Sequence, residues 1–169
     1  MVKIGIIGGA GYTGGETIRL LLNHPHVELT FVHSRSNAGN PLHAAHPDLI
    51  GETSVTFTDT IRQDIDVLFL CLGHGESKKF LLENKIDASI KVIDLSHDFR
   101  GGDSVPGRAF VYGLPEINRD KIRNANNIAN PGCFATTIEL GLLPLAIAGL
   151  LKEVYTTGIT GSTGAGQKL

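Results

Sequence analysis

The chain contains two cysteines, and their surroundings predict different roles. Cys133 comes directly after Pro131 and Gly132 and opens a long apolar run, so we expect a turn before the thiol and a helix after it. Unpaired N–H groups at a helix N-terminus favour the thiolate, which is the nucleophilic form. Cys71 lies inside the apolar run VLFLCL and is expected in the core. A buried, inert thiol is the alternative for Cys133, since free cysteines are often buried, but its setting favours a nucleophile.

A glycine-rich turn near the N-terminus could bind phosphate. Residues 9–14, GAGYTG, match G-x-G-x-x-G, and three glycines form an overlapping G-x-x-G-x-x-G. The turn lies between an expected strand and an expected helix, where glycines let backbone N–H groups approach a pyrophosphate. We therefore predict dinucleotide binding rather than a plain structural turn, by Gly8, Gly9, Ala10, Gly11, Tyr12, Thr13 and Gly14.

The end of the second expected strand indicates which dinucleotide is bound. NAD sites usually carry Asp or Glu there to hold the ribose 2′-hydroxyl. This strand instead runs into Ser34, Arg35 and Ser36, and an arginine can pair with a 2′-phosphate. We therefore predict NADP as the cofactor. The alternative is that Arg35 is simply a solvated surface residue. A reactive thiol beside a nicotinamide favours one chemistry, in which a thioester forms and exchanges a hydride.

Other candidate residues follow strand ends or lie in loops. His74 follows an apolar strand and is expected to contact the cofactor or to be structural. Arg100 is the first candidate for binding a substrate phosphate and Arg108 the second. The alternative for each arginine is an ion pair with a nearby carboxylate, namely Asp98, Asp103 or Glu116.

Two histidines are spaced H-x-x-H, a pattern that two metal ligands on one helical face can show. His43 and His46 have no third ligand close by in the sequence, so a metal site is not supported. We expect both to be surface histidines.

These residues need a scaffold, and the pattern predicts alternating strands and helices. Strands are expected at residues 2–8, 27–34, 66–73, 91–96 and 127–130, and helices at 14–24, 76–85 and 133–151, where Pro144 is expected to kink or end the last helix. This rhythm favours an α/β, Rossmann-type, doubly wound and mostly parallel sheet. Residues 98–120 read as a long polar loop, and a further strand is expected from residue 154.

Composition excludes several classes of protein. The 169 residues are 41% hydrophobic with a formal net charge of −2, so no broad cationic surface is present to bind nucleic acid. No apolar run approaches the roughly 20 residues that span a bilayer. Two cysteines form no disulfide framework, which favours a cytoplasmic location. The early glycines also argue against a signal peptide.

Several motifs together resemble one enzyme family. GIIGGAGYTGGE, IDLSHDFR, YGLPEINR, ANPGCFAT and TGSTGAG occur in the order found in N-acetyl-gamma-glutamyl-phosphate reductases, and the resemblance covers essentially the whole chain. NPGCFAT is the most specific element. That family is similar in fold and chemistry to aspartate-semialdehyde dehydrogenase.

The resemblance implies NADPH-dependent reduction of N-acetyl-L-glutamyl 5-phosphate to the 5-semialdehyde in arginine biosynthesis, with release of phosphate. It implies that Cys133 forms the thioester, that Asn130 contacts the substrate, and that His74, Ser162 and Gly164 lie near the cofactor. A structural strand-to-loop turn is the alternative for residues 162–166. The whole protein would act on a small molecule, without nucleic acid or membrane, as a dimer or tetramer.

The resemblance also implies that part of the enzyme is missing. Family members are about twice as long and carry a catalytic histidine in a second domain, whereas no histidine here lies beyond His97. We expect residues 1–150 to be the NADP domain and 151–169 the start of a truncated α+β substrate and dimerisation domain. By itself this fragment should be inactive. The alternatives are a reductase of a related acyl phosphate (N-succinylglutamyl, aminoadipyl or aspartyl), or a non-catalytic dinucleotide-binding module.

Overall fold

The computed structural model describes residues 1–165, and it contains a seven-stranded parallel sheet with helices on both faces. The strand order is β3-β2-β1-β4-β5-β9-β8, and every pairing within it is parallel. The strands are β1 (Val2–Ile7), β2 (Val27–His33), β3 (Phe57–Thr58), β4 (Val67–Leu70), β5 (Lys91–Asp94), β8 (Val111–Tyr112) and β9 (Asn127–Ala129). The predicted doubly wound parallel fold is confirmed.

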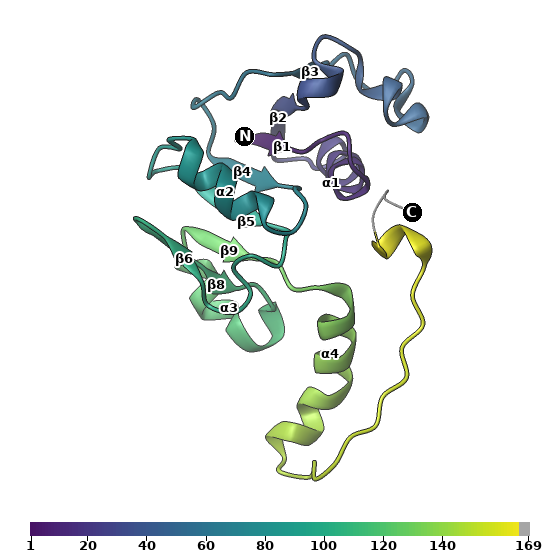
Figure 1. The fold of residues 1–169 in the computed structure, drawn as a ribbon, viewed down its shortest axis with the longest axis vertical. Helices are drawn as coiled ribbons and strands as arrows, with labels where there is room; N and C mark the ends of the chain where they lie inside the picture. Colours follow the sequence, from purple (N-terminus) through teal and green to yellow (C-terminus); the bar gives the residue numbers. More distant parts are fainter. Residues whose placement is uncertain (166–169) are drawn as a thin grey trace.

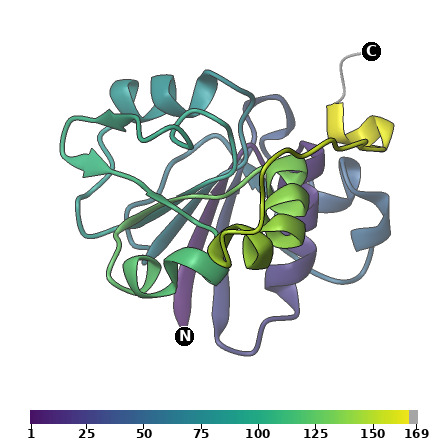
Figure 2. The same ribbon diagram turned by 90° about the horizontal axis from the view of Figure 1, so that it is seen from below.

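Four helices follow strands or connect them. They are α1 (Tyr12–Leu22), α2 (Glu76–Glu83), α3 (Pro115–Arg123) and α4 (Cys133–Ile147). Short 3₁₀ turns occupy Arg35–Asn37, Leu42–Ala44, Pro47–Leu49 and Ser162–Ala165. Figure 2 shows α1 and α2 on opposite faces of the sheet. Within the described residues, no helix combines the length and apolar character that a membrane crossing requires.

The side chains of β1 point alternately to the two faces of the sheet, so they pack in two clusters of the hydrophobic core. Ile4 and Ile6 pack in one cluster with Ile18 of α1. Ile7 points the other way and packs in a second cluster that includes Phe80 of α2. Successive side chains of a strand point to opposite faces, so a strand buried on both sides is apolar throughout. This is why the buried part of β1, residues 4–7, contains no polar side chain.

Residues 98–120 are more structured than the sequence predicts. They contain an antiparallel pair, β6 (Ser104–Val105) with β7 (Arg108–Ala109), then β8 and the start of α3. β8 joins the main sheet beside β9 through the register Val111↔Ile128. Pro115 stands at the first position of α3, where its missing N–H costs nothing. The prediction of one long loop was therefore wrong, because short strands and a mostly polar helix carry little periodic signal.

The C-terminal part of the described chain departs from the prediction at the last expected strand. α4 continues through Pro144 to Ile147, so the proline does not end the helix, and the kink expected as the other possibility stays a prediction. Residues 154–161 form no strand, since no described strand lies beside them to supply hydrogen bonds. α4 extends away from the sheet with no buried residue, and the space-filling view shows its apolar surface. The boundary expected near residue 150 stays a prediction.

Candidate functional site

The glycine turn stands at the point where the order of the sheet reverses. β1 pairs with β2 on one side and with β4 on the other. The chain therefore builds the sheet outward from β1 through β2 to β3, and then returns to the other side of β1 to form β4. In open parallel sheets this switch point opens a crevice at the carboxyl ends of the strands. Residues 8–14 follow β1 there. The N–H groups of Gly8 and Gly9 both donate to the His33 carbonyl, at 3.2 and 3.1 Å, which ties the turn to β2.

Two positions in the turn cannot carry a side chain. Gly8 has a φ of +81°, and a Cβ there would lie 2.4 Å from the Cys71 carbonyl oxygen. A Cβ on Gly14 would lie 2.5 Å from the Gly8 carbonyl oxygen, so the helix could not approach the turn. The turn therefore has the tight bend and close helix packing that dinucleotide-binding glycines provide.

The turn leaves backbone donors available to an anion. The N–H groups of Tyr12, Thr13 and Gly14, at the first turn of α1, donate to no acceptor within the described chain. Such unpaired donors at the positive end of a helix form a binding site for phosphate. The residues predicted to bind a dinucleotide are thus brought together in geometry that suits one.

The end of β2 carries a small polar cluster beside an exposed arginine. The Asn37 amide donates to the Ser34 hydroxyl at 3.2 Å and to the Ser36 hydroxyl at 3.1 Å. Arg35 is exposed and lines a pocket that also includes Gly8 and Ser34. Asn37 was not among the predicted residues, although a polar residue three positions after Ser34 was a readable signal.

His33 closes this strand and is buried, in contrast to the arginine that follows. Burial, and then the positive charge of Arg35, lowers the pKa of His33 below its ordinary value. The ring is therefore neutral at pH 7 and adds no charge beside Arg35. The arginine is the cationic group at the end of β2.

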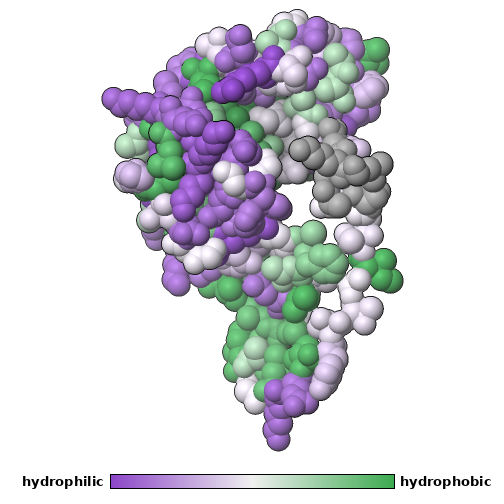
Figure 3. Space-filling model, viewed as in Figure 1, coloured by the Kyte–Doolittle hydropathy of each residue, from purple (hydrophilic) through white to green (hydrophobic). Residues whose placement is uncertain are grey.

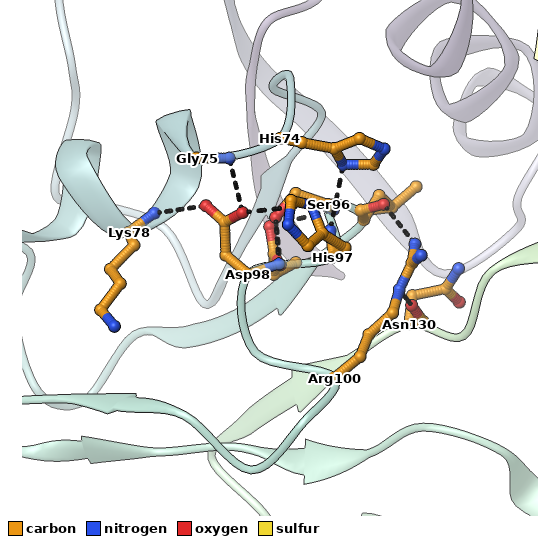
Figure 4. Close-up of polar contacts among 10 residues, drawn as sticks. His74, Gly75, Lys78, Ser96, His97, Asp98, Arg100 and Asn130 are labelled. Atoms are coloured by element: carbon orange, nitrogen blue, oxygen red, sulfur yellow. Dashed lines mark hydrogen bonds and ion pairs between the residues drawn. The ribbon is translucent and has the colours of Figure 1, made fainter. Parts of the chain in front are cut away.

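The loops that follow β4 and β5 are joined by hydrogen bonds (Figure 4). Asp98, whose side chain is 3% exposed, accepts from the Gly75 N–H at 2.6 Å and from the Lys78 N–H at 3.0 Å. Burial alone would raise the pKa of Asp98, but these N–H groups, His97 and Ser96 together hold it below its usual value. The carboxylate thus caps α2 from the neighbouring loop.

His74 takes part in the same joint. The His97 backbone N–H donates to His74 Nδ1 at 3.3 Å, and the two rings meet edge to face at 4.3 Å. Because Nδ1 accepts, the proton of a neutral His74 lies on Nε2. The structure places His74 at the carboxyl end of β4, beside the crevice edge where a cofactor role was expected. That role stays a prediction.

Arg100 reaches across to the turn that precedes Cys133. Its Nε donates to the Asn130 carbonyl and its Nη2 to the Leu95 carbonyl, both at 2.8 Å (Figure 4). A Cβ on Gly132 would lie 2.7 Å from Arg100 Nη1, so the guanidinium lies directly against this turn. No described carboxylate pairs with Arg100, so the ion-pair alternative does not hold for it.

Arg108 is used differently, and neither reading of it matches the structure. The guanidinium is buried and donates to the carbonyl oxygens of Ile86, Asp87 and Ile90 and to the side-chain oxygen of Asn127. These acceptors hold the β7 strand on the segment before β5. Arg108 pairs with no carboxylate side chain, and its occupied donors give it a structural role in place of the predicted phosphate contact.

Cys133 is exposed and is the first residue of α4, with Gly132 as the N-cap. The first intrahelical bond runs from the Thr136 N–H to the Gly132 carbonyl, at 2.9 Å. The N–H groups of residues 133–135 therefore have no acceptor within the described chain. Cys133, Phe134 and Thr137 line a pocket with the segment 156–160. The predicted setting of a turn, a thiol and then a helix is present.

The other cysteine is a core residue, as its sequence context predicts. Cys71 is buried at the end of β4, and burial raises its pKa to about 12. The Thr17 hydroxyl, 3.6 Å from the sulfur, donates to the Thr13 carbonyl and so leaves the thiol to act as the donor. A thiol that stays protonated is inert.

The remaining predicted residues lie in loops and short turns. The side chain of Asn130 donates to the Pro131 carbonyl at 3.1 Å and is exposed. Gly164 and Ser162 belong to the last 3₁₀ turn, and residue 166 of the predicted glycine-rich turn lies outside the described residues. The surface expectation was wrong for His46, which is buried. Within residues 1–165, no three His, Cys, Asp or Glu side chains gather as metal ligands would.

A glycine turn at the switch point and an exposed cysteine at a helix start, both at the carboxyl edge of one parallel sheet, define the class of protein as a dinucleotide-binding domain with an accessible thiol. Residues 3–125 match the model of the semialdehyde dehydrogenase NAD-binding domain. The chain belongs to the semialdehyde dehydrogenase family, and its cofactor class is a nicotinamide dinucleotide.

Curated relatives agree with the motif resemblance. The chain is 55% identical over 170 residues to an N-acetyl-gamma-glutamyl-phosphate reductase of Christiangramia forsetii, covering all of this chain and 52% of the relative. It is 57% identical over 168 residues to the enzyme of the same name from Azobacteroides pseudotrichonymphae, covering 98% of this chain and 52% of the relative. The resemblance is therefore confirmed, and the chain spans about half the length of the curated relatives it matches.

Solved structures share the fold at low sequence identity. Aspartate semialdehyde dehydrogenase II from Vibrio cholerae, complexed with ASA, matches 99% of this chain and 48% of its own with a TM-score of 0.68 and 19% identity. The Candida albicans aspartate semialdehyde dehydrogenase with NADP matches 89% of this chain and 48% of its own, with a TM-score of 0.64 and 18% identity. At this identity, the likeness supports the fold alone.

Proposed function

We propose that this chain is the cofactor-binding and nucleophile-bearing part of an NADPH-dependent N-acetyl-gamma-glutamyl-phosphate reductase of arginine biosynthesis. The observation that carries the proposal is the position of Cys133. It is exposed at the first residue of α4, next to a turn held by Arg100, at the same sheet edge as the glycine turn. Relatives with 55% and 57% identity bear this name.

The cofactor fits the residues present. The glycine cradle at Gly8 and Gly14 would be filled by any Cβ, and the first turn of α1 offers unpaired donors for the pyrophosphate. Arg35, with the hydroxyls of Ser34 and Ser36, supports NADP over NAD because a guanidinium matches a phosphate. Bound NADPH would supply the hydride that turns an acyl thioester into an aldehyde.

Cys133 would carry the acyl group. Its thiolate attacks the carbonyl carbon of the acyl phosphate, a sulfur–carbon bond forms, and the carbon–oxygen bond to phosphate breaks. Inorganic phosphate leaves with the electron pair, and the acyl group remains as a thioester. After reduction, the carbon–sulfur bond breaks, the aldehyde is released and the thiolate is regenerated. The unpaired N–H groups at the start of α4 stand beside this reacting sulfur as hydrogen-bond donors.

Charged and polar groups near the thiol suit a phosphorylated substrate. Arg100 uses Nε and Nη2 for backbone carbonyls, while Nη1 lies against Gly132 and donates to no described acceptor. A guanidinium held this way can neutralise a phosphate without having to be ordered on binding. Asn130, two residues before Gly132, would contact the same substrate. His74, Ser162 and Gly164 remain proposed cofactor contacts.

Apart from the thiol itself, none of the described residues that line the Cys133 pocket carries an ionisable side chain that could act as an acid or base. His74 accepts a hydrogen bond at Nδ1 from the His97 backbone N–H, and the two rings pack edge to face between the β4 and β5 loops. We propose that the general acid or base lies in the part of the enzyme that the curated relatives have beyond the matched half, and that the complete enzyme is a homo-oligomer. The substrate's acyl group, acetyl or succinyl, would be tested by comparing the two acyl phosphates.

The test is substitution of Cys133 in the full-length enzyme. Cys133→Ser should reduce turnover in the phosphate-dependent assay by on the order of 10⁴-fold, because loss of a nucleophile removes the covalent route. NADPH binding, measured by fluorescence titration, should stay within about twofold, since Cys133 does not belong to the glycine turn. The matched control is Cys71→Ser, which changes a buried thiol that has no part in the chemistry.

Near-normal turnover of Cys133→Ser would contradict the thioester route. Loss of NADPH binding in the same variant would show that the substitution disturbed the fold, and the assay would then be repeated with Cys133→Ala. A wild-type enzyme that binds NADPH but reduces no acyl phosphate would favour the non-catalytic dinucleotide-binding module.

A further inference from the structure

His46 lies buried against the dinucleotide-binding turn, although its sequence context resembles that of a surface histidine. It belongs to the segment between β2 and β3, just before the 3₁₀ turn Pro47–Leu49. Its Nε2 lies 2.7 Å from the Gly9 carbonyl oxygen. Because a carbonyl oxygen can only accept, Nε2 carries the proton and donates.

The ring is fixed on several sides. A Cβ on Gly15 would lie 2.6 Å from His46 Cε1, so the ring fills the space that a side chain of α1 would need. The Phe57 ring packs near it, with centroids 6.4 Å apart. Arg19 of α1 donates to both carboxylate oxygens of Asp48 at 2.7 Å, which fastens the His46 segment to the helix.

The bond to Gly9 determines the direction of a neighbouring donor. In a trans peptide, the C=O of one residue and the N–H of the next point in opposite directions. The Gly9–Ala10 peptide is trans, so holding the Gly9 carbonyl toward His46 turns the Ala10 N–H away from it. The Ala10 N–H donates to no acceptor within the described chain. The preceding peptide is fixed as well, because the Gly9 N–H donates to the His33 carbonyl.

We propose that His46 is a positioning residue for the cofactor. By donating from Nε2 to the Gly9 carbonyl, it fixes the Gly9–Ala10 peptide so that the Ala10 N–H joins the donors of the first turn of α1 in facing the pyrophosphate. A donor that is already oriented loses less freedom on binding than one that must be ordered. This inference rests on the dinucleotide-binding part of the proposed function and is independent of the chemistry at Cys133.

The first test compares NADPH binding by three variants of the full-length enzyme, measured by fluorescence titration. His46→Phe keeps a ring in the space but removes the donor, and should raise the Kd for NADPH about five- to tenfold, the usual effect of one lost hydrogen bond. His46→Gln restores an amide donor and should stay within about twofold. The control is His43→Phe, the same substitution in the same segment, at a side chain that forms no hydrogen bond with residues 1–165, and it should leave the Kd unchanged.

A second measurement separates positioning from a merely structural role. Adenosine 2′,5′-bisphosphate carries a phosphate that would reach the turn, whereas adenosine 2′-monophosphate lacks it. His46→Phe should weaken the first ligand five- to tenfold and leave the second unchanged. Equal weakening of both would overturn the inference, because the substitution would then have disturbed the whole pocket. If His46→Phe fails to fold, His46→Asn, whose shorter amide cannot reach Gly9, replaces it.

The experiments distinguish failure of this inference from failure of the proposed function. Unchanged NADPH binding in His46→Phe, or failure of His46→Gln to restore affinity, would overturn the inference alone. A wild-type enzyme that binds neither NADPH nor NADH would overturn the proposed function together with this inference.

Discussion

The proposed preference for NADP over NAD depends on Arg35, and a single substitution tests it. It is exposed beside the hydroxyls of Ser34 and Ser36, so its removal should cost only its own interaction with the cofactor. Arg35→Ala should weaken NADPH about 10- to 100-fold, since a charge-assisted hydrogen bond contributes about 1.5–3 kcal/mol. NADH, which lacks the 2′-phosphate, should bind within about twofold of wild type.

The measurement is a pair of titrations with NADPH and NADH on the full-length enzyme. Arg119→Ala, which removes an exposed arginine of α3, is the matched control and should change neither affinity. If Arg35→Ala weakened the binding of NADPH and NADH equally, the result would count against the NADP assignment.

Single residues also show which parts of the candidate site can be predicted from the sequence. The glycine turn and Cys133 were found because a local pattern, such as strand, turn and helix, creates their environment. Arg108 was misread because its partners are backbone carbonyls of residues 86, 87 and 90, which become neighbours only through the fold. His46 was misread for the same reason, since its acceptor lies 37 residues away in the sequence. Contacts of this kind leave no mark in a local pattern.

At the scale of elements, Asp98 joins the loop after β5 to the start of α2. Its carboxylate accepts two backbone N–H groups and is nearly inaccessible to solvent. In Asp98→Asn, one amide nitrogen must face an N–H donor, so one buried donor loses its partner. We expect a loss of about 1–3 kcal/mol in the free energy of unfolding at pH 7, measured by denaturant titration.

This loss should depend on pH in a definite direction. The pKa of Asp98 is lower in the folded state than in the unfolded chain, where an aspartate titrates near about 4. Its contribution is therefore fully present above about pH 4 and disappears as the pH falls through the lower, folded-state pKa. The stability difference between wild type and Asp98→Asn should shrink over that range, and a difference that grows on acidification would contradict this role.

Elements also differ in how readily the sequence predicted them. The five longer strands and α1, α2 and α4 were predicted because they bury apolar side chains at a regular period. The short β3, β6, β7 and β8 were missed, since two residues carry no period. The strand expected from residue 154 shows the opposite error, because a β-branched run forms a strand only when a neighbouring strand accepts its hydrogen bonds.

At the scale of the whole molecule, the cofactor site should be linked to global stability. A ligand that binds only the folded state adds about 2.7 kcal/mol at a concentration of 100 times its Kd, so NADPH should raise the Tm of the full-length enzyme in a concentration-dependent way. Gly14→Ala should abolish this rise, because the added Cβ would lie 2.5 Å from the Gly8 carbonyl oxygen and push α1 away from the turn.

Gly141→Ala provides the matched control for the melting experiment. Gly141 lies within α4, and a Cβ there meets no atom within 4 Å, so the variant should keep the full NADPH-dependent rise. Its own Tm should increase slightly, since alanine favours a helix over glycine by about 1 kcal/mol. A Gly14→Ala enzyme that folds and still shows the wild-type rise would mean that NADPH does not use the glycine turn. Loss of the rise in Gly14→Ala alone would link the cofactor to the close approach of α1 and β1 around which the sheet is organised.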